Sequence, residues 1–197
     1  MPSYRRVRPR SRAAWRAWLT DHHASSPGVW LVFARKHSGL TTVSYNDAVE
    51  EALCFGWIDT TLNPIDDKFY AQLFTPRRPR STWAASNKAR VERLIAAGLM
   101  TDAGLAAIAV ARKNGSWTSI DHVEAATLPK ELAAALAANK AAKKNWPAYS
   151  LTCRKQFLYW LAGAKRAETR AARIKEIVAC AETGLTYAQY YDQRRSR

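Results

Sequence analysis

The sequence has few cysteines and no long hydrophobic run. Its 197 residues include three cysteines, Cys54, Cys153 and Cys180, which are odd in number, widely spaced and set in apolar, helix-like surroundings. We therefore expect buried free thiols in a reducing cytoplasm rather than a disulfide framework. No stretch approaches the roughly 20 apolar residues of a membrane helix, so we expect a cytoplasmic protein without membrane insertion.

Residues that form common catalytic and cofactor motifs are also scarce. His22 and His23 are adjacent and would face different directions on a helix, while His37 and His122 are isolated. This spacing gives no metal-ligand pattern, and we expect no metal. Cys54 has no histidine close in sequence that would activate it as a nucleophile. There is no glycine-rich phosphate loop, and we expect no cofactor.

Acidic residues are outnumbered almost two to one. The chain has 31 Lys and Arg against 16 Asp and Glu, a formal net charge of +15. The excess is uneven: residues 1–12 carry five arginines and no acid, whereas residues 13–70 carry four basic and seven acidic side chains. A cationic surface of this kind attracts polyanions.

The first half of the chain mixes helical and strand-like patterns. Val29–Ala34 is short, apolar and rich in β-branched and aromatic residues, which predicts a buried strand. Two further strand-like runs, 57–62 and 69–74, flank a segment rich in turn formers and predict a hairpin. Apolar spacing and capping residues predict helices over four segments: 11–24, 44–56, 81–98 and 101–114.

From Pro129 onward the pattern is helical throughout. We predict helices over 129–144, 150–161 and 164–182. The fold class is therefore α+β: a small antiparallel or mixed sheet with packed helices, followed by a helical C-terminal portion. We expect one compact unit, with eight tryptophans joining its two portions. Its parts are a flexible Arg-rich tail at 1–12, an α+β portion at 13–118, a helical portion packed on it at 119–185, and a basic C-terminal tail at 186–197.

Several motifs resemble a known family. In the first half they are Ala-Leu-Cys-Phe-Gly-Trp-Ile-Asp at 52–59, Tyr70, Phe-Thr-Pro-Arg-Arg-Pro at 74–79, Trp83 and Asn87-Lys88; in the second half they are Tyr149, Arg154, Trp160, 164–170 and 173–174. Together they resemble the YdeI/OmpD-associated, or bacteriocin-protection, family over residues 45–178. The resemblance implies a bacterial cytoplasmic protein with a mixed α+β half, a helical half and a protective role.

One group of residues beside the hairpin has the composition of a small-molecule pocket. Arginine offers a rigid fork of donors for a carboxylate or phosphate, and tryptophan offers a flat face. We predict a cleft beside the 57–74 hairpin that binds a small anionic or aromatic compound, in a protective or stress-associated protein. The alternative is structural, with Asp59 pairing Arg77 and the tryptophans filling the core. The predicted ligand-binding residues are Trp57, Asp59, Tyr70, Arg77, Arg78, Trp83 and Asn87.

The same residues leave an enzymatic alternative open. Asp59 and Tyr70 are candidates for a catalytic acid and base on neighbouring strands, and Arg77 for an electrostatic clamp, in an enzyme that modifies a toxic small molecule. No base or nucleophile is evident beyond them, so we favour binding.

A basic stripe supports a second alternative. Arg166, Arg170 and Arg173 are spaced for one face of a helix, with Lys165 beside them. This stripe predicts an anion-binding surface which, with the Arg-rich tail, would give weak, non-specific binding of nucleic acid. The alternative is a solvated helix face whose arginines pair with nearby glutamates. The sequence identifies neither the ligand nor the oligomeric state.

Overall fold

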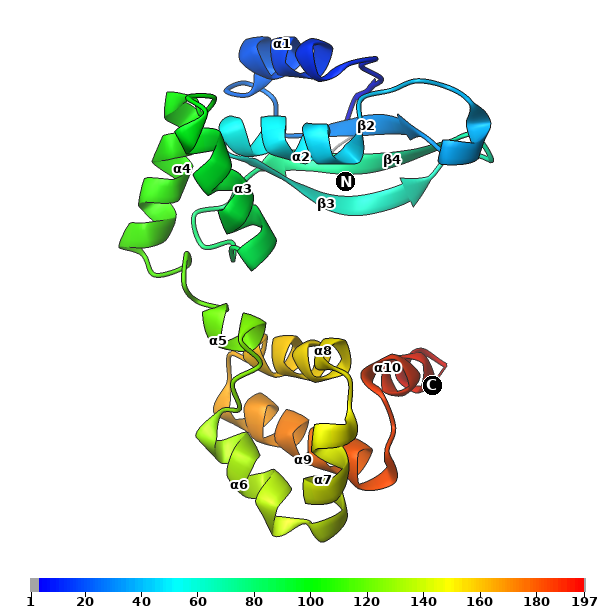
Figure 1. Cartoon of the computed structure of the whole chain (residues 1–197), viewed down its shortest axis with the longest axis vertical. Helices are drawn as coiled ribbons and strands as arrows, with labels where there is room; N and C mark the ends of the chain where they lie inside the picture. Colours follow the sequence, from blue (N-terminus) through cyan, green and yellow to red (C-terminus); the bar gives the residue numbers. More distant parts are fainter. Residues whose placement is uncertain (1–3, 197) are drawn as a thin grey trace. The chain divides into compact units, whose positions relative to one another are not determined.

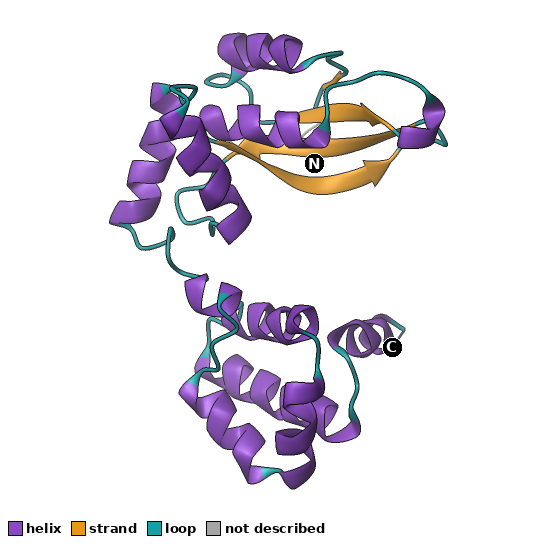
Figure 2. Ribbon diagram, viewed as in Figure 1, coloured by secondary structure: helices purple, strands orange, loops and turns teal. Residues whose placement is uncertain are grey.

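The computed structural model describes residues 4–196 and divides the chain into two compact units, Met1–Thr118 and Ser119–Arg197 (Figure 1). The division falls at the boundary expected between the α+β portion and the helical portion, and each unit buries its own hydrophobic cluster. Unit 1 is α+β and unit 2 is entirely helical, which confirms the predicted fold class (Figure 2).

The sheet of unit 1 has four strands in the order β1-β2-β4-β3. β1 is parallel to β2, and the other pairs are antiparallel, so the sheet is mixed. The predicted hairpin is β3 and β4, with a bulge between Asp59 and Leu62. The strands are β1 (Arg6–Val7), β2 (Val29–Ala34), β3 (Trp57–Pro64) and β4 (Phe69–Pro76).

Two helices cover one face of this sheet, and two more pack beside it (Figure 1). Serine or threonine side chains cap α1, α2 and α4 at the N-terminus, as the sequence predicted for α1 and α2. The helix α3 begins at Ala85, later than the start at residue 81 that the sequence predicts, and has no side-chain cap. The helical elements are α1 (Arg12–His22), η1 (Lys36–Ser38), α2 (Tyr45–Cys54), α3 (Ala85–Ala96) and α4 (Asp102–Lys113).

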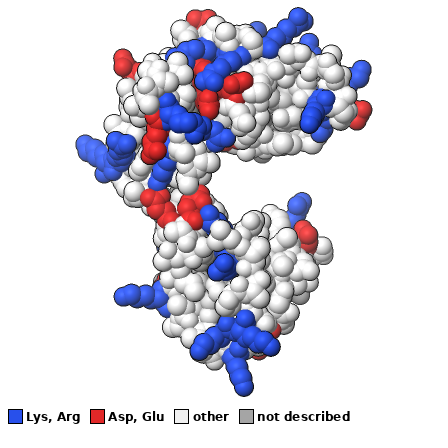
Figure 3. Space-filling view, in the orientation of Figure 1, with Lys and Arg blue, Asp and Glu red and all other residues white. Residues whose placement is uncertain are grey.

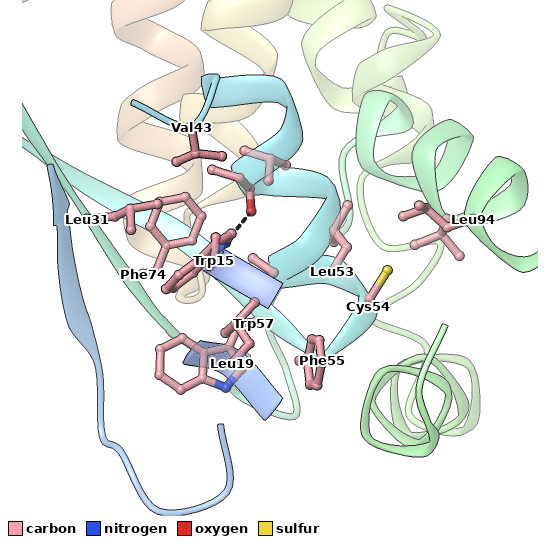
Figure 4. Close-up of a cluster of buried hydrophobic side chains, with 14 of the residues drawn as sticks. Trp15, Leu19, Leu31, Val43, Leu53, Cys54, Phe55, Trp57, Phe74 and Leu94 are labelled. Carbon is pink, nitrogen blue, oxygen red and sulfur yellow. Dashed lines mark hydrogen bonds between the residues drawn. The ribbon is translucent and has the colours of Figure 1, made fainter. Parts of the chain in front are cut away.

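Large aromatic side chains fill the space between the helices and the sheet (Figure 4). Trp15 of α1 is fully buried, lies edge-on to Phe74 of β4 at 5.7 Å between ring centroids, and donates through Nε1 to the Ala48 carbonyl oxygen at 3.0 Å. This hydrogen bond satisfies the one polar atom of the side chain. Six of the eight tryptophans lie in unit 1 and two in unit 2.

Residues 4–12, the described part of the Arg-rich segment at 1–12, do not form the flexible tail that we expected, and residues 1–3 of that prediction lie outside the described residues. Arg6 and Val7 pair with β2, and the Pro9 carbonyl oxygen accepts a hydrogen bond from the Val43 amide at 3.0 Å. Arg12 begins α1, and its Nε donates to Glu51 at 2.6 Å. A high density of arginines does not prevent this segment from folding, because Arg6 and Val7 pair with β2 while Val7 and Pro9 are partly buried.

Unit 2 is a bundle of short helices. The helix expected over 129–144 is divided in two, because Asn139 is extended (φ −110°, ψ 113°) and caps the second helix. The expected C-terminal tail is also helical, and a capping box between Thr186 and Gln189 starts it. The elements are α5 (Asp121–Glu124), α6 (Lys130–Ala138), α7 (Lys140–Asn145), η2 (Trp146–Ala148), α8 (Leu151–Ala162), α9 (Ala167–Thr183) and α10 (Tyr187–Arg195).

All three cysteines are free and buried, which confirms the prediction made from their spacing. Across residues 4–196, no helix is both long and apolar enough to cross a membrane.

Candidate anion-binding site

Arg77 is the central residue of the candidate site. It follows the last residue of β4, and its backbone amide donates to the Gly56 carbonyl oxygen at 2.9 Å. Its guanidinium carbon lies 3.6 Å from the centroid of the Trp83 ring. Nη1 donates to the Thr82 carbonyl oxygen at 3.1 Å and to Ser81 Oγ at 3.4 Å. The loop that follows the strand therefore folds back and holds the guanidinium on the indole.

The charge of Arg77 is poorly compensated. Burial lowers the pKa of Arg77 to about 10, and the charge of Asp59 opposes this shift. Within the described part of the chain no carboxylate lies within ion-pair distance, and the buried Nε has no hydrogen-bond partner. A pKa near 10 still leaves the side chain protonated at neutral pH. The fold thus holds a desolvated cation that an anion would stabilise.

A pocket of about 170 Å³ opens beside this guanidinium. One wall is polar and cationic, formed by Arg77, Arg78 and Ser81. The other wall is apolar and comes from the helix α4. The α4 residues that line it are Ala106, Ala107, Val110 and Ala111. The arrangement suits a small molecule with an anionic group and an apolar part.

The structure gives Asp59 a different partner from the one expected. Its Oδ2 accepts hydrogen bonds from the Tyr45 hydroxyl at 2.8 Å and from Gln72 Nε2 at 3.3 Å. Burial and the adjacent Asp59 raise the pKa of Tyr45 to about 12. Tyr45 is 42% exposed and lies in the first turn of α2. No sequence signal identified it or Gln72.

Asp59 and Tyr70 lie on neighbouring strands but are not brought together. Asp59 is paired with Phe74, whereas Tyr70 lies opposite Pro64 and stacks on Phe33 at 5.3 Å. Four residues along a strand are about 13 Å. The proposed acid and base therefore do not form a pair in this fold, because the strand register separates them.

The two tryptophans of the predicted site do not offer a stacking surface. Trp57 and Trp83 are each only 1% exposed. Trp57 packs edge-on against Trp18, and Arg77 lies over the face of Trp83. The alternative in which the tryptophans fill the core is correct, and an aromatic ligand has no free indole face here.

The remaining predicted residues differ in their placement. Arg78 is exposed and lines the pocket. Asn87 lies in the first turn of α3, where its Oδ1 accepts a long hydrogen bond from Arg90 at 3.4 Å, and it does not line the pocket. The site is thus smaller than the sequence suggested, and it includes a wall of α4 that sequence reasoning missed.

The basic stripe of unit 2 is largely occupied by intramolecular contacts. Arg170 Nε donates to Glu131 at 2.6 Å. The guanidinium carbon of Arg173 lies 5.0 Å from the Trp160 ring centroid, and Nη1 donates to the Trp160 carbonyl oxygen. Lys165 and Arg166 are exposed. The stripe is therefore not the continuous free surface that helical spacing predicted.

No group of three or more His, Cys, Asp or Glu side chains within residues 4–196 could hold a metal ion.

Over α2 and α3, acidic and basic side chains are interleaved, as Figure 3 shows for this face. Glu50, for example, contacts both Arg12 and Arg93.

The fold defines a two-unit protein in which an α+β unit precedes a helical bundle. Residues 7–107, just over half of the chain, match the family described as a domain of unknown function (DUF8412), and the chain belongs to that family. Residues 125–184 match the family described as bacteriocin-protection, YdeI or OmpD-associated, which confirms the resemblance within unit 2. No curated protein and no solved structure gives a significant match.

Proposed function

We propose that the protein binds a small organic anion at Arg77 and acts by binding rather than by turnover. The observation that carries this proposal is the desolvated guanidinium of Arg77, which lacks an acidic partner among residues 4–196 and lines a pocket. A largely desolvated charge without an acidic partner costs stability. An anion that enters the pocket would offset this cost through a charge-assisted hydrogen bond.

The dimensions of the pocket set the size of the ligand. Drug-sized ligands occupy sites of about 300–1,000 Å³, whereas this pocket measures about 170 Å³. The ligand class is therefore a small carboxylate or phosphate with a short apolar group, which would contact Val110 and the alanines of α4. Such an apolar group would pack on the alanine side chains and would not need a free aromatic ring, which is consistent with the burial of Trp83.

Binding is favoured over catalysis by the state of the neighbouring polar groups. Asp59 already accepts two hydrogen bonds, and the raised pKa of Tyr45 makes its hydroxyl a poor acid at neutral pH. The family that residues 125–184 match is described as bacteriocin-protection. A binding protein of this kind would protect by sequestering a harmful compound, in keeping with the cytoplasmic location expected from the sequence.

The experiment is a panel of small carboxylates and inorganic phosphate, measured by thermal shift and calorimetry on the full chain. We expect a carboxylate with a short apolar group to bind to wild type and to lose its binding in Arg77→Met, which keeps the length of the side chain and removes its charge. Ala106→Phe should also abolish binding by filling the apolar half of the pocket.

Arg112→Met provides the matched control. Arg112 is an exposed arginine whose guanidinium lies 5.1 Å from the Trp117 ring centroid, and it lines no part of the pocket. Binding should persist in this control variant. In wild type, binding should weaken as the pH rises through about 10, because Arg77 loses its proton there. Equal loss in both arginine variants, or no response to any anion, would contradict the proposal.

A further inference from the structure

The sheet of unit 1 has two very different faces. Side chains alternate along a strand, so Leu31, Phe33 and Phe74 point together into the core beneath α1 and α2. Their neighbours Trp30 and Phe69 point to the opposite face. Both helices lie on the first face (Figure 1), and among residues 4–118 no helix is drawn over the second face.

This second face carries aromatic side chains around a patch of small ones. Trp30 of β2 and Phe69 of β4 are partly exposed. Between them, Val32 lies opposite Ala71 in the β2–β4 register, and both are buried outside the main core cluster. The partly exposed rings of Trp30 and Phe69, and not the buried side chains between them, are therefore the parts of this face that a ligand can reach.

A third aromatic residue extends the surface toward the N-terminus. Tyr4 is partly exposed, and a Cβ atom added to Gly28 would lie 2.9 Å from Tyr4 Cε1 and 3.0 Å from Thr75 Cγ2. Thr75 follows Phe74 and therefore belongs to the second face. The absence of a side chain at Gly28 is what lets Tyr4 pack beside the strand ends.

A row of arginines forms the edge of the same face. Arg6, Arg8 and Arg10 are exposed and alternate with Val7 and Pro9, which are partly buried. Successive members of such a row are about 6.6 Å apart along an extended chain. Within the described residues none of the three has an acidic partner, so their charge is available to a ligand.

The arginine row and the aromatic surface meet at a pocket. Arg8 and Arg10 line a pocket of about 200 Å³ together with Thr41 and Phe69, and the guanidinium carbon of Arg8 lies 5.1 Å from the Phe69 ring centroid. A phosphate in this pocket would contact two cations, while the group attached to it would contact the ring.

We propose that this face of unit 1 binds single-stranded nucleic acid. Proteins that bind single strands combine a basic groove along the backbone with aromatic rings on which bases stack, and an open sheet face can carry such rings. Here the arginine row supplies the charge, and Tyr4, Trp30 and Phe69 supply the rings. The residues are distinct from the Arg77 site and from the occupied stripe of unit 2, so the proposal stands independently of the anion pocket.

The salt dependence of binding tests the arginine row. Fluorescence anisotropy of labelled oligothymidylate and oligouridylate with the full chain should give an affinity that falls with salt. Each neutralised phosphate contributes about 0.7 to the logarithmic slope for a single strand. The triple variant Arg6→Ala/Arg8→Ala/Arg10→Ala should therefore flatten the slope by about 2.

A second triple variant removes the same charge elsewhere. Lys140, Lys143 and Lys144 are exposed on α7 of unit 2, and their replacement by alanine should leave the slope unchanged. If both triple variants flatten the slope equally, the attraction comes from net charge and the proposed face is wrong.

The aromatic surface needs a readout that is independent of charge. Trp30→Leu should weaken binding by about 5- to 150-fold without changing the salt slope, and Trp30→Phe should retain most of the affinity. Phe69→Leu gives the same test if Trp30→Leu unfolds. A duplex of equal length should bind more weakly because its bases are already stacked. Equal affinity for duplex or inorganic polyphosphate, or wild-type affinity in both leucine variants, would overturn the proposal.

Discussion

The two units bury polar groups in different ways. The three buried polar or charged side chains of the described chain, Glu51, Gln72 and Ser116, all lie in unit 1. Glu51 is 2% exposed and is held by Arg12 and Arg16 at 2.6 and 2.7 Å. Unit 2 instead buries apolar side chains and places the Tyr149 hydroxyl between two backbone carbonyls. Both units have large apolar cores, and they differ in that unit 1 also buries a charged side chain, whereas unit 2 buries a neutral hydroxyl.

The largest effect should come from a cavity in unit 2. Phe157 is fully buried and contacts the rings of Trp146, Tyr149 and Tyr187. Phe157→Ala should lower the free energy of unfolding of unit 2 by about 3–5 kcal/mol. Hydrogen exchange resolved by segment should show faster exchange in Ser119–Arg197 and unchanged exchange in the core of unit 1. Equal acceleration in both units would show that they unfold together.

The corresponding test in unit 1 removes the buried carboxylate. Glu51→Gln leaves Arg12 and Arg16 without their shared partner, and breaking a buried ion pair costs about 3–5 kcal/mol. We expect about 3 kcal/mol, the low end of this range, because both arginines are about one third exposed and water screens them. Urea unfolding measures the loss.

Glu131→Gln provides the matched control in unit 2. Glu131 also pairs with an arginine, Arg170 at 2.6 Å, but its side chain is 48% exposed. Its loss should cost no more than about 1 kcal/mol. If the two variants cost the same, burial is not what distinguishes the ion pairs of the two units.

The ion network also illustrates the limit of sequence reasoning. Alternating and helical periodicity predicted β2, the β3–β4 hairpin and most helices, because these patterns reflect which face is buried. Periodicity does not reveal which of the adjacent acids Glu50 and Glu51 turns inward, because the choice depends on two arginines of a helix 35 or more residues away. The arginines of the N-terminal segment were likewise read as a tail, although one of them anchors this network.

The candidate site was predictable only in part, for a similar reason. Arg77, Arg78 and Trp83 lie close together in the sequence, and the structure places them together at the pocket. Asp59 and Tyr70 depend on strand register, which a bulge after Asp59 changes, and α4 contributes its wall through tertiary packing alone. Local motifs thus identified the loop, and long-range packing determined which residues line the pocket.

A smaller effect should arise where helix α4 crosses the end of α2. A Cβ atom at Gly104 would lie 2.2 Å from the Cys54 carbonyl oxygen, a backbone atom that is held by Thr101. Gly104→Ala should therefore destabilise unit 1 by about 2 kcal/mol despite the better helix propensity of alanine. A Cβ atom at Gly163 of unit 2 would meet nothing closer than Arg173 Nη1 at 3.3 Å and the Trp160 oxygen at 3.4 Å. Thermal unfolding should show little change for Gly163→Ala, and a similar loss in both variants would refute the steric explanation.

The smallest effect concerns the neutral hydrogen bonds of unit 2 and depends on pH. The Tyr149 hydroxyl lies 2.9 Å from the Cys180 oxygen and 2.8 Å from the Leu185 oxygen. Tyr149→Phe should cost about 1–2 kcal/mol at neutral pH, because these carbonyls lose a buried donor. Tyr191→Phe, at a position that is 48% exposed, should stay within about 0.5 kcal/mol of wild type.

The pH dependence follows from the pKa of Tyr149, which burial raises from 10.0 to about 12 in the folded state. The folded protein keeps this proton where the unfolded chain releases it, so the contribution to stability is complete below pH 10 and is lost as the pH rises through about 12. Urea unfolding across this range should show the gap between wild type and Tyr149→Phe closing as the pH increases. A gap that stays constant to high pH would mean that the hydroxyl is not held in its neutral form by burial, and the distinction between the two units would then rest on packing alone.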